Sequence, residues 1–300
     1  MKVTILGNNS ALPAFGRSPT AQVVSVYGQD ILIDCGEGTQ IKMQEYGIKW
    51  RHMDYIFISH LHGDHYFGIF GLLNSMSLLG RTTALHLYAP APLEALIDAV
   101  LNIAGSKHAF PFYFHALPEG AALLVDEKNF SVQCFPVEHR IQCHGFVITR
   151  KTRGRKLLVD KANAAGIPSS FYERLKNGED YVDADGRVIQ NAMLTTDGPS
   201  EKRYAFCADT RYTDSFMEYI KGVDMIYHES TYLNDNESRA AERFHSTAAQ
   251  AAMIARDCGA KQLLLGHYSS RYREIEEFAV EAAVIFPNVL ATEEGAAYEL

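Results

Sequence analysis

The sequence is poor in cysteine, with five among 300 residues, and no two of them form a Cys-x-x-Cys pair. Most of the five lie in or next to apolar runs, which favours buried free thiols over disulfides or metal ligands. Free thiols are typical of a reducing compartment. The cysteines are Cys35, Cys134, Cys143, Cys207 and Cys258.

Long apolar stretches are also missing. No segment approaches the roughly 20 apolar residues that a membrane span needs. Residues 1–7 carry one basic residue and a short apolar run that soon reaches glycine. This pattern predicts a first strand and not a signal peptide, so we expect a cytoplasmic protein with no membrane partner.

An excess of positive charge is absent as well, because the formal net charge is −8. A protein that coats nucleic acid over a broad face usually carries the opposite sign. Any contact with nucleic acid must therefore come from a local basic patch or from bound metal ions. The hydrophobic fraction of 47% and the charged fraction of 21% are those of an ordinary globular protein. No linker, low-complexity tract or short repeat divides the chain.

Six short apolar runs end at a residue that can bind metal or move protons, and helical patterns lie between them. Strands whose carboxyl ends meet at one sheet edge place such residues together, so the sequence predicts an α/β fold with a site at that edge. Helices are expected over residues 66–79, 92–104 and 246–258. The terminal residues of the six runs are Asp34, His60, His139 (after Glu138), Asp209, His228 (before Glu229) and His267.

Between residues 150 and 203 the pattern changes. Residues 151–156 are basic, residues 161–176 suit short helices around Pro168, and residues 183–186 read Asp-Ala-Asp-Gly, a turn signal. Since the strands resume at Asp209, we expect one domain over residues 1–300 with an inserted arm at residues 150–190.

The strongest chemical signal is the run His60-Leu61-His62-Gly63-Asp64-His65. Imidazole nitrogen and carboxylate oxygen are donors that zinc prefers, at roughly 2.0–2.2 Å. The run lies in a turn between a strand and a helix, where alternate side chains can serve two metals. Further ligands are expected from His139, Asp209 and His267, and the Asp209 carboxylate can bridge two ions. The imidazole content favours zinc, although manganese or iron would tolerate the same set.

These residues resemble the metallo-β-lactamase superfamily, and the order of the later motifs resembles the ribonuclease Z family. That family trims the 3′ ends of precursor tRNA. The resemblance covers nearly the whole chain and implies a metallo-β-lactamase αββα sandwich. HLHGDH identifies only the superfamily, whereas the later segments are more specific. They are His228-Glu-Ser-Thr231, His245-Ser-Thr247 and His267-Tyr-Ser-Ser-Arg-Tyr272.

The resemblance implies two zinc ions per subunit, with Asp209 as the bridge. Asp64 would also be the base, and His245, backed by Glu229, would be the acid near the leaving oxygen. The first ion would be held by His60, His62 and His139, and the second by Asp64, His65 and His267.

In the family the inserted arm clamps the tRNA elbow, and the protein is commonly a homodimer in which one subunit's arm serves the other's site. Here the arm offers basic residues for phosphate contacts, namely Lys156, Lys161, Arg174 and Lys176. The segment after the first strand departs from the family pattern. It reads Pro13-Ala-Phe-Gly-Arg-Ser-Pro19 in place of Pro-x-x-x-Arg-Asn.

The resulting hypothesis is a zinc-dependent endoribonuclease that removes the 3′ trailer from precursor tRNA. It would leave a 3′-hydroxyl on the tRNA and a 5′-phosphate on the trailer. The alternatives are a small-molecule phosphodiesterase or arylsulfatase of the same superfamily, and a non-catalytic binding protein. The arm argues against the first, and the complete ligand set argues against the second.

Overall fold

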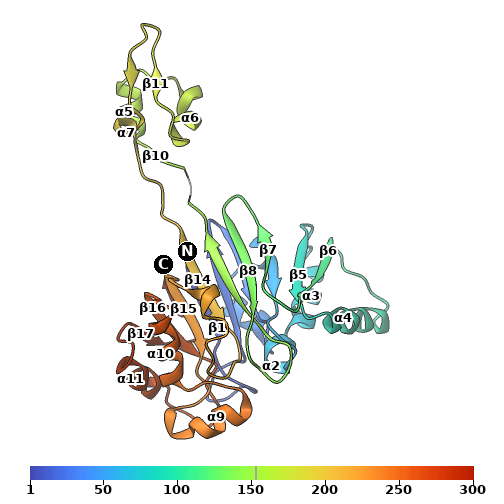
Figure 1. Ribbon diagram of the computed structural model, residues 1–300. Coiled ribbons are helices and arrows are strands. Elements are labelled where there is room, and N and C mark those ends of the chain that lie inside the picture. The colour runs from blue at the N-terminus through green and yellow to red at the C-terminus, as the bar shows by residue number, and fades with distance from the viewer. Residues whose placement is uncertain (153) are drawn as a thin grey trace.

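The computed structural model describes residues 1–152 and 154–300. Two seven-stranded mixed sheets pack face to face, and helices cover both outer faces (Figure 1). This is the expected αββα sandwich. The first sheet has the order β18-β1-β2-β3-β4-β5-β6 and the second β17-β16-β15-β14-β9-β8-β7.

The bounds of the first-sheet strands are as follows: β1 Lys2–Gly7, β2 Ala21–Val26, β3 Gln29–Ile33, β4 Met53–Phe57, β5 Leu85–Ala89, β6 Phe112–Ala116 and β18 Ala297–Glu299. Those of the second sheet are β7 Ala122–Asp126, β8 Phe130–Pro136, β9 His144–Arg150, β14 Lys202–Cys207, β15 Met225–Glu229, β16 Gln262–Gly266 and β17 Val289–Ala291. The helices outside the arm are α1 Thr39–Glu45, α2 Gly63–Tyr66, α3 Ile69–Leu78, α4 Pro92–Ile103, α8 Met217–Ile220, α9 Glu237–Arg243, α10 Ala248–Asp257 and α11 Glu276–Ala283.

Successive side chains of each strand point to opposite faces of the sheet, and this divides the core into layers. In β4, Phe57 points between the two sheets, whereas Ile56 points toward α3 and α4. In β14, Phe206 likewise faces the inner layer, whereas Cys207 packs against the layer that contains α10 and α11. Because both faces of both sheets are covered, these strands read as nearly continuous apolar runs.

The carboxyl ends of the strands that precede the proposed ligands meet at one edge, as predicted. Strands β14, β15 and β16 are parallel neighbours in the second sheet, and β3 and β4 are parallel in the first. The residues that follow these strands therefore gather where the two sheets approach each other. The helices expected over residues 92–104 and 246–258 are α4 and α10. Thr247 caps α10 through a capping box with Gln250.

The helix expected over residues 66–79 is different in the structure. It begins earlier, at Gly63, and breaks into α2 and α3 around Gly68. The backbone N–H of Gly68 donates to the Cys35 carbonyl at 2.9 Å, outside the helix. A Cβ at Gly68 would lie 2.1 Å from the carbonyl oxygen of Gly36, so only glycine allows this close approach.

The segment between β9 and β14, called the arm below, extends away from the sheets, at the end of the molecule opposite to α2 (Figure 1). Its small core contains Ala162, Ile167, Leu175 and Leu194. The expected short helices and tight turn are present. The arm elements are β10 Lys156–Leu157, α5 Val159–Ala164, α6 Tyr172–Lys176, β11 Tyr181–Val182, β12 Val188–Ile189, α7 Asn191–Leu194 and β13 Thr195–Thr196.

All five cysteines are buried and free, as expected. None of the described helices combines the length and the apolar character that crossing a bilayer requires.

Candidate metal centre and active site

Three imidazoles meet in a first group. Nε2 of His60 lies 3.0 Å from Nδ1 of His62. That same Nδ1 lies 3.1 Å from Nε2 of His139. His60 follows β4, His62 directly precedes α2, and His139 follows β8. Together with one oxygen of Asp209, their ligand atoms lie within 4.8 Å of one another and can hold one metal ion.

A second group forms beside the first. Nε2 of His65 lies 3.2 Å from Nε2 of His267, and Oδ2 of Asp64 lies 3.4 Å from the same atom of His267. His267 follows β16 with a φ of 61°, a left-handed conformation that is uncommon for a residue other than glycine. Such strain persists where the surroundings fix it, typically at functional sites. This second group can also hold one ion.

Asp209 lies between the two groups and directs one oxygen to each. Its Oδ2 is 3.5 Å from Nε2 of His60, whereas its Oδ1 is 3.4 Å from Nε2 of His65 and 3.2 Å from Nε2 of His267. Oδ1 is buried and has no hydrogen-bond partner among the described residues. A buried carboxylate oxygen without a donor is costly unless a cation faces it.

Neighbouring groups fix which ring nitrogen points inward in His65, His139 and His60. Nδ1 of His65 donates to Asp34 Oδ2 at 2.7 Å, and Nδ1 of His139 donates to the Phe244 carbonyl at 2.9 Å. Nδ1 of His60 faces the Ser59 hydroxyl at 3.0 Å. Contacts of this kind leave Nε2 of each ring free for a metal.

The histidines of the two groups differ in the direction of their pKa shifts. Burial lowers the pKa of His60 well below its usual range, with repulsion from His65 adding to the effect. Burial and the nearby His139 lower the pKa of His62 to about 4. These rings are therefore neutral at pH 7, which is the form that binds metal.

The pKa of His65 is shifted in the opposite direction. Burial alone would lower its pKa, but the carboxylates of Asp209, Asp64 and Asp34 outweigh that effect and raise the pKa well above the usual value. Three carboxylates around one buried ring leave an excess of negative charge. A metal cation would balance that charge in place of a proton.

His245 and Glu229 form a buried pair next to the two groups. Nδ1 of His245 donates to Oε1 of Glu229 at 2.9 Å. Burial opposes protonation of His245, but the Glu229 charge outweighs it and raises the pKa of the ring. The same carboxylate accepts from the backbone N–H and the hydroxyl of Thr231, at 2.9 and 2.8 Å. With its oxygens occupied, Glu229 is suited to hold His245 and not to exchange protons itself.

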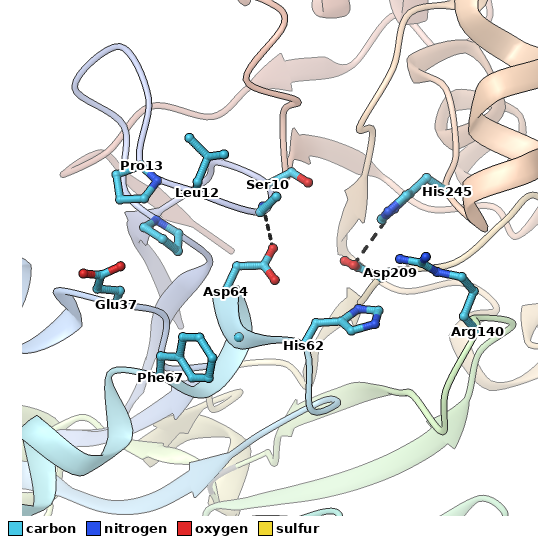
Figure 2. A pocket seen from close by; sticks show the side chains of 13 residues that line it. Ser10, Leu12, Pro13, Glu37, His62, Asp64, Phe67, Arg140, Asp209 and His245 are labelled. Carbon is cyan, nitrogen blue, oxygen red and sulfur yellow. Dashed lines mark hydrogen bonds and ion pairs between the residues drawn. The ribbon is translucent and has the colours of Figure 1, made fainter.

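A cavity of about 410 Å³ opens over the site. Figure 2 shows Leu12 and Phe67 on one side of Asp64, and Arg140 and His245 on the other. Oδ2 of Asp64 also accepts from the backbone N–H of Ala11 at 2.7 Å. The loop after β1, where the sequence departs from the family pattern, thus forms a wall of the cavity.

The seven proposed ligands, Asp64 included, and the His245–Glu229 pair are therefore brought together at one sheet edge. The four arm residues are not: they lie far from it along the arm (Figure 1). Lys156 and Lys161 are exposed, whereas Arg174 pairs with Glu179 and Lys176 pairs with Glu173.

Sequence reasoning missed the partners that orient the ligands. Asp34 was noted only as a strand end, although a buried carboxylate after an apolar strand next to a histidine cluster could have indicated its role. Thr231 contacts Nδ1 of both His267 and His245, at 2.9 and 3.2 Å. The backbone contact from Ala11 to Asp64 carries no sequence signal, because every residue except proline supplies a backbone N–H.

Comparison with known proteins places this geometry in a family. Residues 1–160 match the family model described as Anti-Pycsar protein Apyc1. The match spans just over half of the chain, so the sequence of this part is that of a member of this family. Residues 179–268 match the beta-lactamase superfamily domain. The first match contains the HLHGDH run and the second contains Asp209 and His267.

Full-length relatives are more specific. Ribonuclease Z of Bacteroides fragilis (strain YCH46) is 38% identical over 291 residues, which cover 97% of this chain and 96% of that protein. Ribonuclease Z of Bacteroides thetaiotaomicron is 40% identical, with coverage of 97% and 92%.

Solved structures share the fold. Human tRNase Z, short form, has a TM-score of 0.72 and 24% identity, over 100% of this chain and 99% of that one. The metallo-beta-lactamase fold protein YhfI of Bacillus subtilis has a TM-score of 0.70 and 20% identity, over 99% of each chain. The chain therefore belongs to the ribonuclease Z family, metal-dependent hydrolases built on the metallo-β-lactamase fold.

Proposed function

We propose that this chain is a zinc-dependent endoribonuclease that removes the 3′ trailer from precursor tRNA. The products would be a tRNA with a 3′-hydroxyl and a trailer with a 5′-phosphate. The observation that carries the proposal is Asp209, whose two oxygens face two separate histidine groups beside the buried His245–Glu229 pair. The full-length likeness to proteins named ribonuclease Z supports RNA as the substrate class.

The donor set suits zinc. Imidazole nitrogens dominate both groups, and magnesium or calcium would be served by oxygen ligands instead. The unpartnered Oδ1 of Asp209 and the negative surroundings of His65 support a cation in each group. When bound, two such ions supply the Lewis acidity that lowers the pKa of a water and offsets charge on the phosphate under attack. His60, His62 and His139 would hold one ion, Asp64, His65 and His267 the other, and Asp209 would contact both.

Asp64 is placed to accept a proton from the attacking water. Burial alone would raise its pKa, but the His65 ring and the contact with His267 outweigh this and hold the pKa well below its usual range. The carboxylate is therefore ionised at pH 7, and it lines the cavity where the phosphate must enter.

His245 is placed to donate a proton to the leaving oxygen. The ring lines the same cavity, and the Glu229 charge outweighs burial and raises its pKa, which favours the protonated form that a general acid needs. Glu229 is 1% exposed and does not reach the cavity wall. We therefore assign Glu229 as a positioning residue for His245.

We also propose that the chain acts as a homodimer. The arm and the site lie at opposite ends of β9 and β14, so one subunit's arm is directed away from its own site (Figure 1). A second subunit would bring an arm and a site together on one tRNA. Lys156 and Lys161 are exposed and form no ion pair within the described residues, so they can contact phosphate, while the acidic partners of Arg174 and Lys176 compete with RNA there.

The test compares two substrates on the zinc-loaded protein. Precursor tRNA should be cleaved once, at the 3′ end, and the tRNA fragment should accept ligation at its 3′-hydroxyl. Hydrolysis of bis-p-nitrophenyl phosphate without cleavage of the tRNA would favour the small-molecule phosphodiesterase or arylsulfatase instead. His245→Ala should slow cleavage of precursor tRNA and leave the zinc content intact. Loss of zinc in that variant would mean that His245 is a ligand.

A further inference from the structure

Three arginines gather in a second cavity that adjoins the metal centre. The cavity has a volume of about 210 Å³. We call it the arginine pocket and define it by Arg140, Arg239 and Arg243, with Ser269 and Ser270 on its wall. None of the described residues that line it is acidic. Arg140 and Arg243 are exposed and Arg239 is half-buried, and an anion in this cavity would be attracted by all three positive charges.

The arginine pocket also lacks internal partners for its charge. Within residues 1–152 and 154–300, no carboxylate forms an ion pair with Arg140, Arg239 or Arg243, whereas Arg211 nearby pairs with Glu138. Nε of Arg239 is buried and has no hydrogen-bond partner in that part of the chain. A buried N–H donor that meets neither protein nor solvent is costly, so the geometry is suited to a ligand that accepts hydrogen bonds. Guanidinium forks match phosphate oxygens in particular.

The position of the pocket identifies which phosphate it would take. His245 and Arg140 line both the arginine pocket and the cavity over the metal centre. If His245 protonates the leaving oxygen, the ribose that carries this oxygen lies on the His245 side. The 5′-phosphate of the same nucleotide then extends past His245 and into the arginine pocket.

The opposite side of the metal centre does not offer such a site. Leu12 and Phe67 form an apolar wall there, and Glu37 is the charged residue near them (Figure 2). The described residues that line this side of the cavity include Glu37 and no arginine, so a phosphate there would meet an acidic group. The charge distribution thus gives the RNA strand a direction across the site.

We infer that the arginine pocket binds the phosphodiester immediately upstream of the one that is cleaved, on the retained tRNA strand. This inference rests on the proposed function and adds to it a subsite for the 5′-phosphate of the last retained nucleotide. Arg239 and Arg243 supply the charge, and the hydroxyls of Ser269 and Ser270 are placed to add hydrogen bonds.

The experiment neutralises single phosphates. Precursor tRNA is assembled by ligation with one uncharged methylphosphonate, either at the upstream linkage or, as a control, at the first linkage of the trailer beyond the cut. Cleavage is measured for the wild type, for the Arg239→Gln/Arg243→Gln double variant, and for Arg256→Gln. Arg256 is exposed and paired with Asp257 on another face, so it is a matched control.

The upstream methylphosphonate should lower kcat/KM of the wild type and of Arg256→Gln by about tenfold or more, and the trailer methylphosphonate should not. The double variant, which keeps only Arg140 of the three arginines, should lose most of this sensitivity, so that its ratio between unmodified and upstream-modified substrate falls toward one. The readout is the ratio of kcat/KM for two substrates of the same protein. A variant that has lost part of its folded population or its zinc is affected equally with both substrates, so the ratio does not change. An equal loss in the double variant and the wild type, or no loss in the wild type, would overturn the inference. If the wild type hydrolyses bis-p-nitrophenyl phosphate but leaves unmodified precursor tRNA intact, the proposed function itself fails.

Discussion

Oδ2 of Asp34 lies 2.7 Å from Nδ1 of His65 and orients the ring. The same carboxylate accepts from the hydroxyl of Ser59 at 2.9 Å, and that hydroxyl contacts Nδ1 of His60. One buried side chain therefore supports a proposed ligand in each of the two histidine groups. Asp34 itself has a φ of 57°, a backbone strain that the surrounding contacts must offset.

Asp34→Asn should weaken zinc binding by about 10–100-fold, because the amide removes the charge that orients His65 and increases its basicity. Competition with a chromophoric chelator measures the affinity, and elemental analysis measures the content. Asp30→Asn is the matched control, since Asp30 lies on β3, the strand that Asp34 follows, and its carboxylate accepts from the Ser25 hydroxyl and contacts neither histidine group. Equal zinc affinity in the Asp34 variant and the control would contradict the assigned role.

Glu229→Gln should shift the pH dependence of cleavage. Glu229 raises the pKa of His245 above its ordinary value of 6.5. A general acid must be protonated, so the rate is high below this pKa and falls as the pH rises through it. Without the carboxylate charge, the pKa falls and the alkaline decline begins at lower pH. The profile of kcat/KM between pH 5 and pH 9 tests this, and Glu242→Gln, on the exposed face of α9, should leave the profile unchanged.

Zinc should stabilise the folded chain. Removal of the metal leaves Asp64, Asp209 and Asp34 around the His65 ring without a cation to balance them. At a free zinc concentration 100 times the dissociation constant, linkage predicts about 2.7 kcal/mol of added stability per site. Thermal unfolding with excess chelator and with added zinc measures the difference. A melting temperature that does not depend on zinc would argue against both sites.

Deletion of the arm should affect the two substrates differently. Arg150 and Lys202 are paired across β9 and β14, so an Asn-Gly turn can replace residues 151–201 and close a two-residue hairpin. The shortened protein should still hydrolyse bis-p-nitrophenyl phosphate. Its KM for precursor tRNA should rise at least tenfold, which corresponds to a loss of roughly 1.4 kcal/mol in binding free energy. Equal loss of both activities would show that the arm supports the fold of the site.

The proposed dimer can be tested with the same variant. Arm-deleted protein and full-length Asp64→Asn are co-expressed with different tags, and the mixed dimer is purified. If one subunit's arm serves the other's site, the mixed dimer should cleave precursor tRNA faster than either parent. A mixed dimer no faster than the arm-deleted protein would place arm and site in one subunit. Recovery of monomers alone would contradict the dimer.

The architecture and the proposed ligands could be predicted from the sequence, because both depend on local patterns. Apolar runs that end at His60, Asp209 or His267 predict strands with functional residues at one edge, and the structure places all three there. The helix over residues 66–79 was only partly predictable. Its break depends on Gly68 approaching the backbone of Gly36, a contact between segments that the local pattern does not report.

The relative placement of those side chains could not be predicted from local patterns, because it depends on contacts between distant parts of the chain. Asp209 directs one carboxylate oxygen to each histidine group. This arrangement depends on how side chains from the two sheets are oriented in the folded protein. The arginine pocket joins residues from the loop after β8 with residues of α9, which are about a hundred positions apart. The HLHGDH run was visible at once because its donors are neighbours in the chain. The arginines were not, since folding alone brings their charges to one wall beside His245.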